Sequence, residues 1–365
     1  MRDLLDLTRP FLPSGLVAPD TVPYFLDLAE TLPEFRAAGF ECRLASGDDR
    51  VDLQVGVSTE EGQPAVLLDF ARSRRHAGQA WAALARLCEK WASAGSSLNE
   101  GIAEVWLELD RPGTQGCPTA ELGDLVPSVF VVLRPTSNRA ALAVADEISS
   151  TLVPEGQALG GVLDRLSDAC PTPACISHIG VMFGRDLPAM RVHVSPLPLQ
   201  GLATFLADVA WGGDIAEVSS LARWLLAYGD LVVLCLDVVG DVLPRAGLEC
   251  FFHQRRGVDP RWVPLLSRLV ALNLADPEKT DCLLRWPGTL IPPDNVERWP
   301  QRLVVESLLQ PADAFGQIER RLSHVKLTSA PGAPVTAKAY FGFGHVWARP
   351  GDSSTKSAGQ GGRRW

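Results

Sequence analysis

Apolar and polar residues alternate in several short segments of the chain, which is the period of a β-strand with two different faces. In residues 102–110, IAEVWLELD, every second residue is apolar. The opposite face carries Glu104, Trp106, Glu108 and Asp110. The pattern predicts strands with one face against a hydrophobic layer and one face in a polar environment.

These segments come in pairs, and we expect five pairs in all. The pairs are 50–58 with 64–73, 102–110 with 127–135, 175–185 with 190–197, the two arms of 231–252, and 323–329 with 336–347. Helical periodicity of three to four residues follows each of the first four pairs, for example in 77–95 and 139–152, and a helix is also expected in 311–322. Strands from hairpins joined by helices can pair edge to edge and close, which removes exposed sheet edges. We therefore predict an α+β fold, a ten-stranded antiparallel barrel with a polar lumen and a ring of helices.

The hairpin 231–252, LVVLCLDVVGDVLPRAGLECFF, carries one carboxylate in each apolar arm, Asp237 and Glu249. Polar faces of this kind meet bulk water in an ordinary half-exposed sheet. Here the same faces also hold aromatic residues, such as Trp106 and Phe251. A mixture of charged and aromatic side chains is more typical of a ligand-lined interior.

The net charge, the absence of targeting patterns and the cysteine spacing indicate which binding partners and which cellular location to expect. The net charge of −9 and the pI near 5.3 argue against nucleic acid or an anionic membrane surface as the main partner. Signal-peptide and membrane-span patterns are absent, and the eight cysteines form no paired framework, so we expect a cytoplasmic protein with reduced thiols. We expect one domain over 1–349, with 1–40 as a helical segment packed outside the barrel, and a disordered tail at 350–365.

Five hairpin-and-helix units around a polar barrel resemble the ABBA-type prenyltransferases, also called the PT-barrel family. The resemblance covers about residues 40–347 and depends on the order of elements. It implies α-β-β-α units whose lumen holds an allylic diphosphate donor and an aromatic or peptide acceptor. Cations would hold the diphosphate, aromatic rings would shield an allylic cation, and a carboxylate would deprotonate the acceptor. No cofactor is required on this basis, although Mg²⁺ is compatible.

The candidate residues are those at the alternate strand positions that we expect to face the lumen. The substrate-binding candidates are Arg134, Arg191, Lys326, Lys338 and Tyr340, with Trp106 and Phe251 as walls. The catalytic candidates are Glu104, Glu108, His193, Asp237 and Glu249, with Asp69 behind the first two. No metal site is predicted, because Cys170, Cys175 and His178 have a loose spacing and no second pair follows them.

Two alternatives remain open from the residues alone. Acids outnumber fixed cations on the expected inward faces, and only one of the three tyrosines, Tyr340, is expected in the lumen. Such a lumen suits a precursor peptide as well as a diphosphate. One alternative is therefore a lanthipeptide-type cyclase, in which histidines and carboxylates around Cys235 move protons while a substrate cysteine adds to a dehydrated residue. The other is a non-catalytic barrel that binds a peptide or a partner protein.

Overall fold

The computed structural model describes residues 1–59, 62–110, 125–134, 136–153, 160–184, 189–253, 259–292 and 297–349. In these ranges an 11-stranded antiparallel sheet has the strand order β11-β1-β2-β3-β4-β5-β6-β7-β8-β10-β9. All of its strands except β9 form a closed ring, because β11 pairs with β1 on one side and with β10 on the other. The predicted ten-stranded barrel is confirmed.

The ring is built from five hairpins. Its strands are β1 (Ala37–Arg43) and β2 (Val51–Ser58), β3 (Ile102–Leu109) and β4 (Ser128–Leu133), β5 (Cys175–Met182) and β6 (Met190–Ser195), β7 (Leu231–Val239) and β8 (Asp241–Phe251), β10 (Phe315–Ala330) and β11 (Ala333–Ala348). The short strand β9 (Gly288–Leu290) pairs with the first half of β10, outside the ring.

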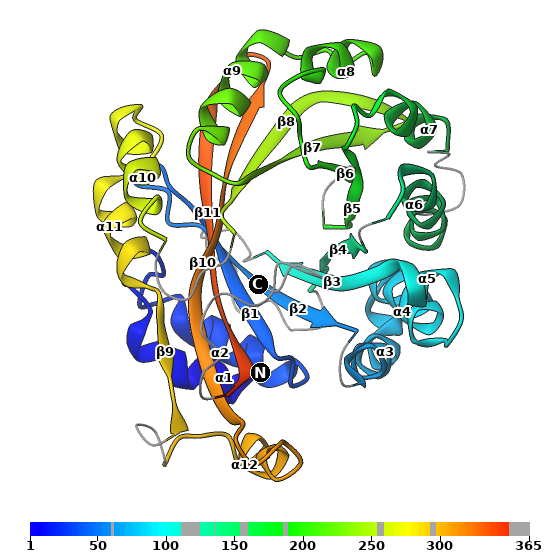
Figure 1. Ribbon diagram of the computed structural model, residues 1–365. Helices are drawn as coiled ribbons and strands as arrows, with labels where there is room; N and C mark the ends of the chain where they lie inside the picture. Colours follow the sequence, from blue (N-terminus) through cyan, green and yellow to red (C-terminus); the bar gives the residue numbers. More distant parts are fainter. Residues whose placement is uncertain are drawn as a thin grey trace.

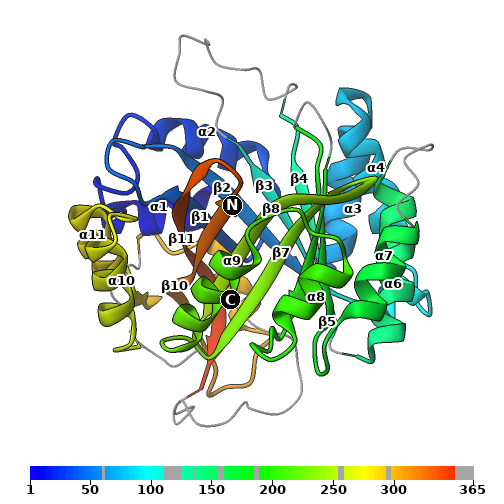
Figure 2. The same ribbon diagram turned by 90° about the horizontal axis from the view of Figure 1, so that it is seen from above.

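Helices cover the outer face of the ring (Figure 1). They are α1 (Arg2–Thr8), α2 (Val22–Thr31), α3 (Gln63–Ser73), α4 (Gln79–Ala92), α5 (Ser97–Gly101), α6 (Asn138–Leu152), α7 (Gly160–Ala169), α8 (Leu202–Asp208), α9 (Ile215–Leu226), α10 (Trp262–Ala271), α11 (Pro277–Arg285) and α12 (Gln301–Ser307). Figure 2 shows α3, α4, α6 and α7 on one side of the barrel, and α1, α2, α10 and α11 on the other. Among the described helices, none combines the length and the apolar character needed to span a membrane.

The main hydrophobic core lies between the strands and the helices. On β3, the outward residues Val105, Leu107 and Leu109 are completely buried. Helix α4 contributes Trp81 and Trp91 to the same core. Burying each such side chain contributes about 1.5–3 kcal/mol, so the outer layer stabilises the barrel and leaves the lumen available for polar groups.

The first expected hairpin was wrong in one arm. Residues 64–73 form helix α3, which begins after Gly62 in a left-handed conformation (φ +72°) and has Pro64 in its first turn, where a missing N–H has no cost. The buried positions Pro64, Leu67 and Ala71 recur every three to four residues, while Asp69 is exposed. A short apolar run fits both a helix and a strand, and here the helical period holds.

The true partner of β2 is β1, whose first four residues belong to the segment 1–40 that we expected to lie outside the barrel as a helical segment. Ala38, Phe40 and Cys42 point outward and are buried, so the strand alternates as the others do. The alanines and glycine of AAGFECR have low strand propensity, which hid this signal. A second correction concerns 311–322, because residues from Phe315 onward belong to β10 and pair with β11.

Candidate functional site

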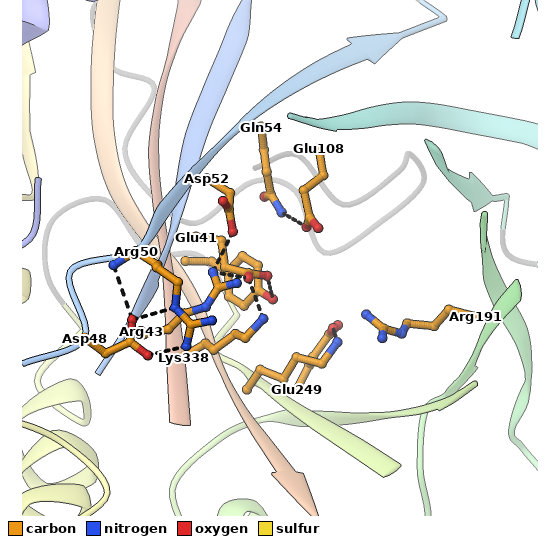
Figure 3. Close-up of polar contacts among 12 residues, drawn as sticks. Glu41, Arg43, Asp48, Arg50, Asp52, Gln54, Glu108, Arg191, Glu249 and Lys338 are labelled. Carbon is orange, nitrogen blue, oxygen red and sulfur yellow. Dashed lines mark hydrogen bonds and ion pairs between the residues drawn. The ribbon is translucent and has the colours of Figure 1, made fainter. Parts of the chain in front are cut away.

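The lumen has two charged walls. The first wall is formed by β11, β1, β2 and β3, and its inward side chains are Glu41, Arg43, Asp52, Gln54, Glu108, Lys338 and Tyr340. The second wall is formed by β6, β7, β8 and β10, and its inward side chains are Arg191, His193, Cys235, Asp237, Arg245, Glu249 and Lys326. Figure 3 shows Arg191 and Glu249 directed into the space that also receives Glu108 and Lys338.

A hub around Glu41 dominates the first wall. Its carboxylate accepts hydrogen bonds from Arg43 Nη1 at 2.7 Å, from Lys338 Nζ at 2.5 Å and from the Tyr340 hydroxyl. Arg43 also donates to Asp52 at 2.6 Å. Burial alone would raise the pKa of Glu41, but Lys338 and Arg43 hold that pKa well below its usual range. Glu41 is therefore a fixed anion.

Glu108 differs from Glu41 although both are buried on the same wall. Its carboxylate accepts a hydrogen bond from Gln54 Nε2 at 3.0 Å. Burial, and then the negative charge of Glu41, raise the pKa of Glu108 to about 7. A carboxyl group with this pKa is populated in both protonation states near neutral pH, which suits a general base or acid.

The second wall consists of one-to-one ion pairs between neighbouring strands. Arg191 and Asp237 lie opposite each other in the β6–β7 register, and Arg191 donates to both carboxylate oxygens, at 2.7 and 3.1 Å. Lys326 and Glu249 lie opposite each other between β10 and β8, with Nζ 2.9 Å from Oε1. Burial raises and the facing cation lowers the pKa of each carboxyl group, and the net direction is downward for Asp237 and Glu249.

A small cavity opens beside these pairs. Its lining residues are Arg191, Cys235, Asp237, Arg245, Gly247, Lys326 and Thr328. Arg245 Nη1 lies 3.9 Å from Asp237, so three cations border the same space. The cavity volume is about 10 Å³, room for roughly one water molecule. A larger ligand must therefore displace side chains, and the carboxylates that now pair with the cations are the groups to be replaced.

An aromatic column crosses from β8 and β10 of the second wall to β11 of the first wall. The rings of Phe251 and His324 stack with centroids 4.3 Å apart, and those of His324 and Tyr340 stack at 4.0 Å. Burial lowers the pKa of His324 to about 4, so the column is uncharged at neutral pH. Phe251 lies two residues from Glu249 on β8, and His324 lies two residues from Lys326 on β10. Neutral stacked rings can stabilise a nearby cation and exclude water.

Trp106 and Glu104 extend the lining along β3. Trp106 Nε1 donates to Glu104 at 3.0 Å, and the indole lies over Gly56 on β2. A Cβ atom at Gly56 would be 2.0 Å from the ring, so glycine is needed there for Trp106 to take this position. Trp106 is buried, whereas Glu104 is half-buried.

Some expected site residues lie elsewhere. Arg134 follows the last residue of β4, is exposed, and donates to Thr59 Oγ1 at 3.1 Å, so it is not part of either charged wall. Asp69 lies on the exposed side of α3 and cannot support a lumen base. Both errors have the same cause, because strand alternation was assumed where there is no strand. Arg134 lies beyond the end of β4, and Asp69 lies in a helix.

Several lining residues were not expected from the sequence. Glu41 and Arg43 were missed because β1 itself was missed, although their alternation with Phe40 and Cys42 carried the signal. Arg245 and His324 lie inside the predicted strand segments 231–252 and 323–329, and they were missed because the alternation that places Glu249 and Lys326 inward was not followed back to them. The remaining candidates, Glu108, His193, Asp237, Glu249, Arg191, Lys326, Lys338, Tyr340, Trp106 and Phe251, line the lumen as expected.

The comparisons with known proteins agree with this architecture. No protein-family model matches the chain, and no curated protein matches its sequence. Among solved structures, the prenyltransferase PriB in its apo form superposes with a TM-score of 0.53 and 14% identity over 93% of this chain and 94% of PriB. PriB with L-tryptophan and dimethylallyl thiolodiphosphate gives a TM-score of 0.54 and 13% identity, over 93% and 95% of the two chains.

A further similar structure is 5-dimethylallyl tryptophan synthase from Streptomyces coelicolor in complex with DMASPP and Trp. Its TM-score is 0.50 with 14% identity, and the match covers 98% of this chain and 96% of that enzyme. The hypotheses of a peptide substrate and of lanthipeptide-type cyclisation gain no support from these comparisons and stay predictions. A closed ten-stranded antiparallel barrel ringed by helices, shared over nearly full length with these enzymes, means that the chain has the PT-barrel fold of the ABBA prenyltransferases.

Proposed function

We propose that the protein transfers an allylic group from a diphosphate donor to an aromatic acceptor inside the barrel. The observation that carries the proposal is the convergence of Arg191, Arg245 and Lys326 on one lumen cavity. Two members of the aromatic column, Phe251 and His324, lie on β8 and β10, which also line the cavity. The PriB and tryptophan synthase complexes contain an allylic diphosphate analogue and tryptophan, which supports this donor and acceptor class.

The cations of the second wall would hold the donor. A diphosphate leaving group carries about three negative charges, and fixed cations in a low-dielectric site stabilise its departure. The carbon–oxygen bond of the donor breaks and both electrons leave with the diphosphate, so an allylic cation remains. Three side-chain cations can supply this stabilisation, and the proposal therefore needs no resident metal ion.

The aromatic column and Glu108 would act on the other reacting groups. The neutral rings of Phe251, His324 and Tyr340 would shield the allylic cation from water. An electron pair of the acceptor ring forms the new bond to the allylic carbon, and the ring then loses a proton. Glu108 is the group suited to take this proton, because its pKa of about 7 makes it available as a base near neutrality.

Donor binding is the first test. Calorimetric titration with dimethylallyl thiolodiphosphate, which cannot readily ionise, should show saturable binding. Arg245→Met should weaken it by about tenfold or more, since a charge-assisted hydrogen bond contributes about 1.5–3 kcal/mol. The half-exposed Arg245 can be replaced without uncovering the core. Arg50→Met is the matched control, because Arg50 pairs with Asp48 at the end of β1 and β2 and does not border the cavity.

Transfer itself is the second test. The protein is incubated with dimethylallyl diphosphate and L-tryptophan, the products are separated by chromatography, and their masses are measured by mass spectrometry. We expect a product heavier than tryptophan by one dimethylallyl group, with the rate rising as Glu108 deprotonates around pH 7. Absence of donor binding at millimolar concentration contradicts the proposed function. Donor binding with no product from any of a panel of indoles and phenols contradicts the aromatic acceptor.

A further inference from the structure

Three side chains of metal-binding type meet on the second wall, on three successive strands. They are His193 on β6, Cys235 on β7 and Glu249 on β8. One possible ligand atom from each lies within 4.8 Å of the others. All three residues are buried, with exposed fractions of 6%, 2% and 6%. No role in the proposed transfer has been assigned to this cluster as a unit.

The strand register brings the cluster together. His193 lies directly opposite Cys235, and Cys235 lies directly opposite Gly247 on the next strand. Gly247 has no side chain, so the Lys326 side chain can pass over it. A Cβ atom at 247 would be 2.6 Å from Lys326 Cε and 3.3 Å from Cys235 Cβ. Glu249, two residues further along β8, then has room to approach His193.

The His193 ring indicates that the cluster is incomplete. Neither ring nitrogen has a hydrogen-bond partner within the described part of the chain, although both are buried. A buried polar group without a partner costs about 1–3 kcal/mol. The carboxylate oxygen Glu249 Oε2 is 3.8 Å from Nδ1, too far for a hydrogen bond. A tetrahedral zinc ion would hold such an N and O about 3.3 Å apart, so this pair needs only a small contraction.

We propose that His193, Cys235 and Glu249 form a binding site for a divalent cation of the zinc class. An imidazole, a thiolate and a carboxylate suit Zn²⁺ or Co²⁺, whereas Mg²⁺ prefers oxygen ligands alone. Cys235 loses its thiol proton to solvent as the metal–sulfur bond forms. Glu249 can bind Lys326 and the metal ion at the same time, because Oε1 accepts a hydrogen bond from Lys326 while Oε2 faces His193.

The proposed site leaves one coordination position open. Three protein ligands and an open fourth position are typical of zinc sites that bind water or an anionic ligand. This inference departs from the sequence-based expectation of no metal, since that expectation considered only Cys170, Cys175 and His178. Those three form no ligand group within the residues that the structure describes. The metal site does not depend on the proposed prenyl transfer.

The test uses Co²⁺ alone as the probe, with the full chain and without substrate. Binding should saturate at one ion per chain, with a thiolate-to-cobalt charge-transfer band and intense visible bands of tetrahedral geometry. Zn²⁺ should displace the cobalt and Mg²⁺ should not. Cys235→Ser should abolish the charge-transfer band and weaken binding on the order of 100-fold, at least as much as loss of an outer-shell partner does.

Cys170→Ser is the matched control, because Cys170 is half-buried and lies outside the cluster. It should leave both the band and the stoichiometry unchanged. X-ray absorption of the zinc-loaded wild type gives an answer independent of any variant's folding, and one sulfur among nitrogen and oxygen neighbours is expected. The proposal is overturned by no saturable cobalt binding, by a band that survives in Cys235→Ser, or by a zinc environment without sulfur.

Discussion

The two charged walls of the lumen use similar residues in different arrangements. On the first wall, two cations and a tyrosine share one carboxylate, Glu41, while Glu108 has an amide partner. On the second wall, each carboxylate has one principal cation, in the pairs Arg191–Asp237 and Lys326–Glu249. Arg245 adds a third cation there. The first wall therefore has an excess of acid and the second an excess of positive charge.

The two arrangements differ in how they tolerate the loss of one charged side chain and in how readily their cations can bind a ligand. A shared hub keeps its central anion satisfied when one donor is lost, because other donors remain. A one-to-one pair leaves a buried charge uncompensated when either partner is lost. The same property makes the second wall responsive to ligands, since an incoming anion can replace a carboxylate at each cation. We infer that the first wall is the more rigid of the two and that the second is the more readily rearranged.

The largest expected effect is the loss of a cation from a one-to-one pair. Lys326→Met leaves Glu249 buried without its cation and should lower the free energy of unfolding by about 3–5 kcal/mol. Lys338→Met should lower it by only about 1 kcal/mol, because Arg43 and Tyr340 still bind Glu41. Denaturant unfolding followed by fluorescence measures both values.

The double variant Lys326→Met with Glu249→Gln provides the control for this comparison. It removes both charges of the pair, so much of the stability lost in Lys326→Met should return. Equal losses for Lys326→Met and Lys338→Met would contradict the distinction between hub and pair. A double variant no more stable than Lys326→Met would show that the lysine stabilises through packing rather than through its charge.

Glu108 gives the next effect, which depends on pH. Its folded pKa of about 7 lies above the ordinary value of 4.5, so the folded state binds this proton more tightly than the unfolded chain does. Stability from this group is present below about pH 4.5 and is lost as the pH rises to about 7. Glu108→Gln removes this dependence and should be more stable than wild type at about pH 8, on the order of 2 kcal/mol.

Thermal unfolding of both proteins at several pH values measures this dependence. The stability difference between Glu108→Gln and wild type should disappear as the pH falls below 4.5, where the wild-type carboxyl group is protonated in both the folded and the unfolded state. The matched control is Glu104→Gln, which changes a half-buried carboxylate on the same strand. A pH-independent difference for Glu108→Gln would contradict the raised pKa.

The barrel could be predicted from the sequence because alternation is a local signal. Strands such as 102–109, with large β-branched or aliphatic residues on one face, stand out without any knowledge of their neighbours. The strand at 37–43 did not stand out, because small residues carry little strand propensity. The run at 64–73 was ambiguous for the opposite reason, since its apolar residues are dense enough to satisfy both periods.

The candidate site was less predictable, because its chemistry depends on register. Parity shows that Arg191 and Asp237 point inward, but only the β6–β7 alignment makes them direct partners. The same holds for Lys326 and Glu249 across β10 and β8. Register depends on hairpin turns and bulges, such as the shift after Leu322 in β10, which no residue pattern specified.

The smallest expected effect concerns ligand affinity. Asp237→Asn removes the carboxylate charge that competes for Arg191, while the amide oxygen can still accept a hydrogen bond. Inorganic diphosphate should then bind about tenfold more tightly, a gain of about 1.4 kcal/mol. Asp52→Asn on the first wall should change this affinity by less than about twofold, because Arg43 keeps Glu41 as its partner.

Calorimetric titration of the three proteins with inorganic diphosphate decides between the walls. Tighter binding in Asp237→Asn alone would place the anion on the second wall, where the carboxylates act as internal competitors for the cations. Tighter binding in Asp52→Asn alone would place it at the hub instead and would contradict the proposed donor position. If both substitutions weaken binding, the acids position the cations rather than compete for them, and the charge excess of the second wall does not determine where the diphosphate binds.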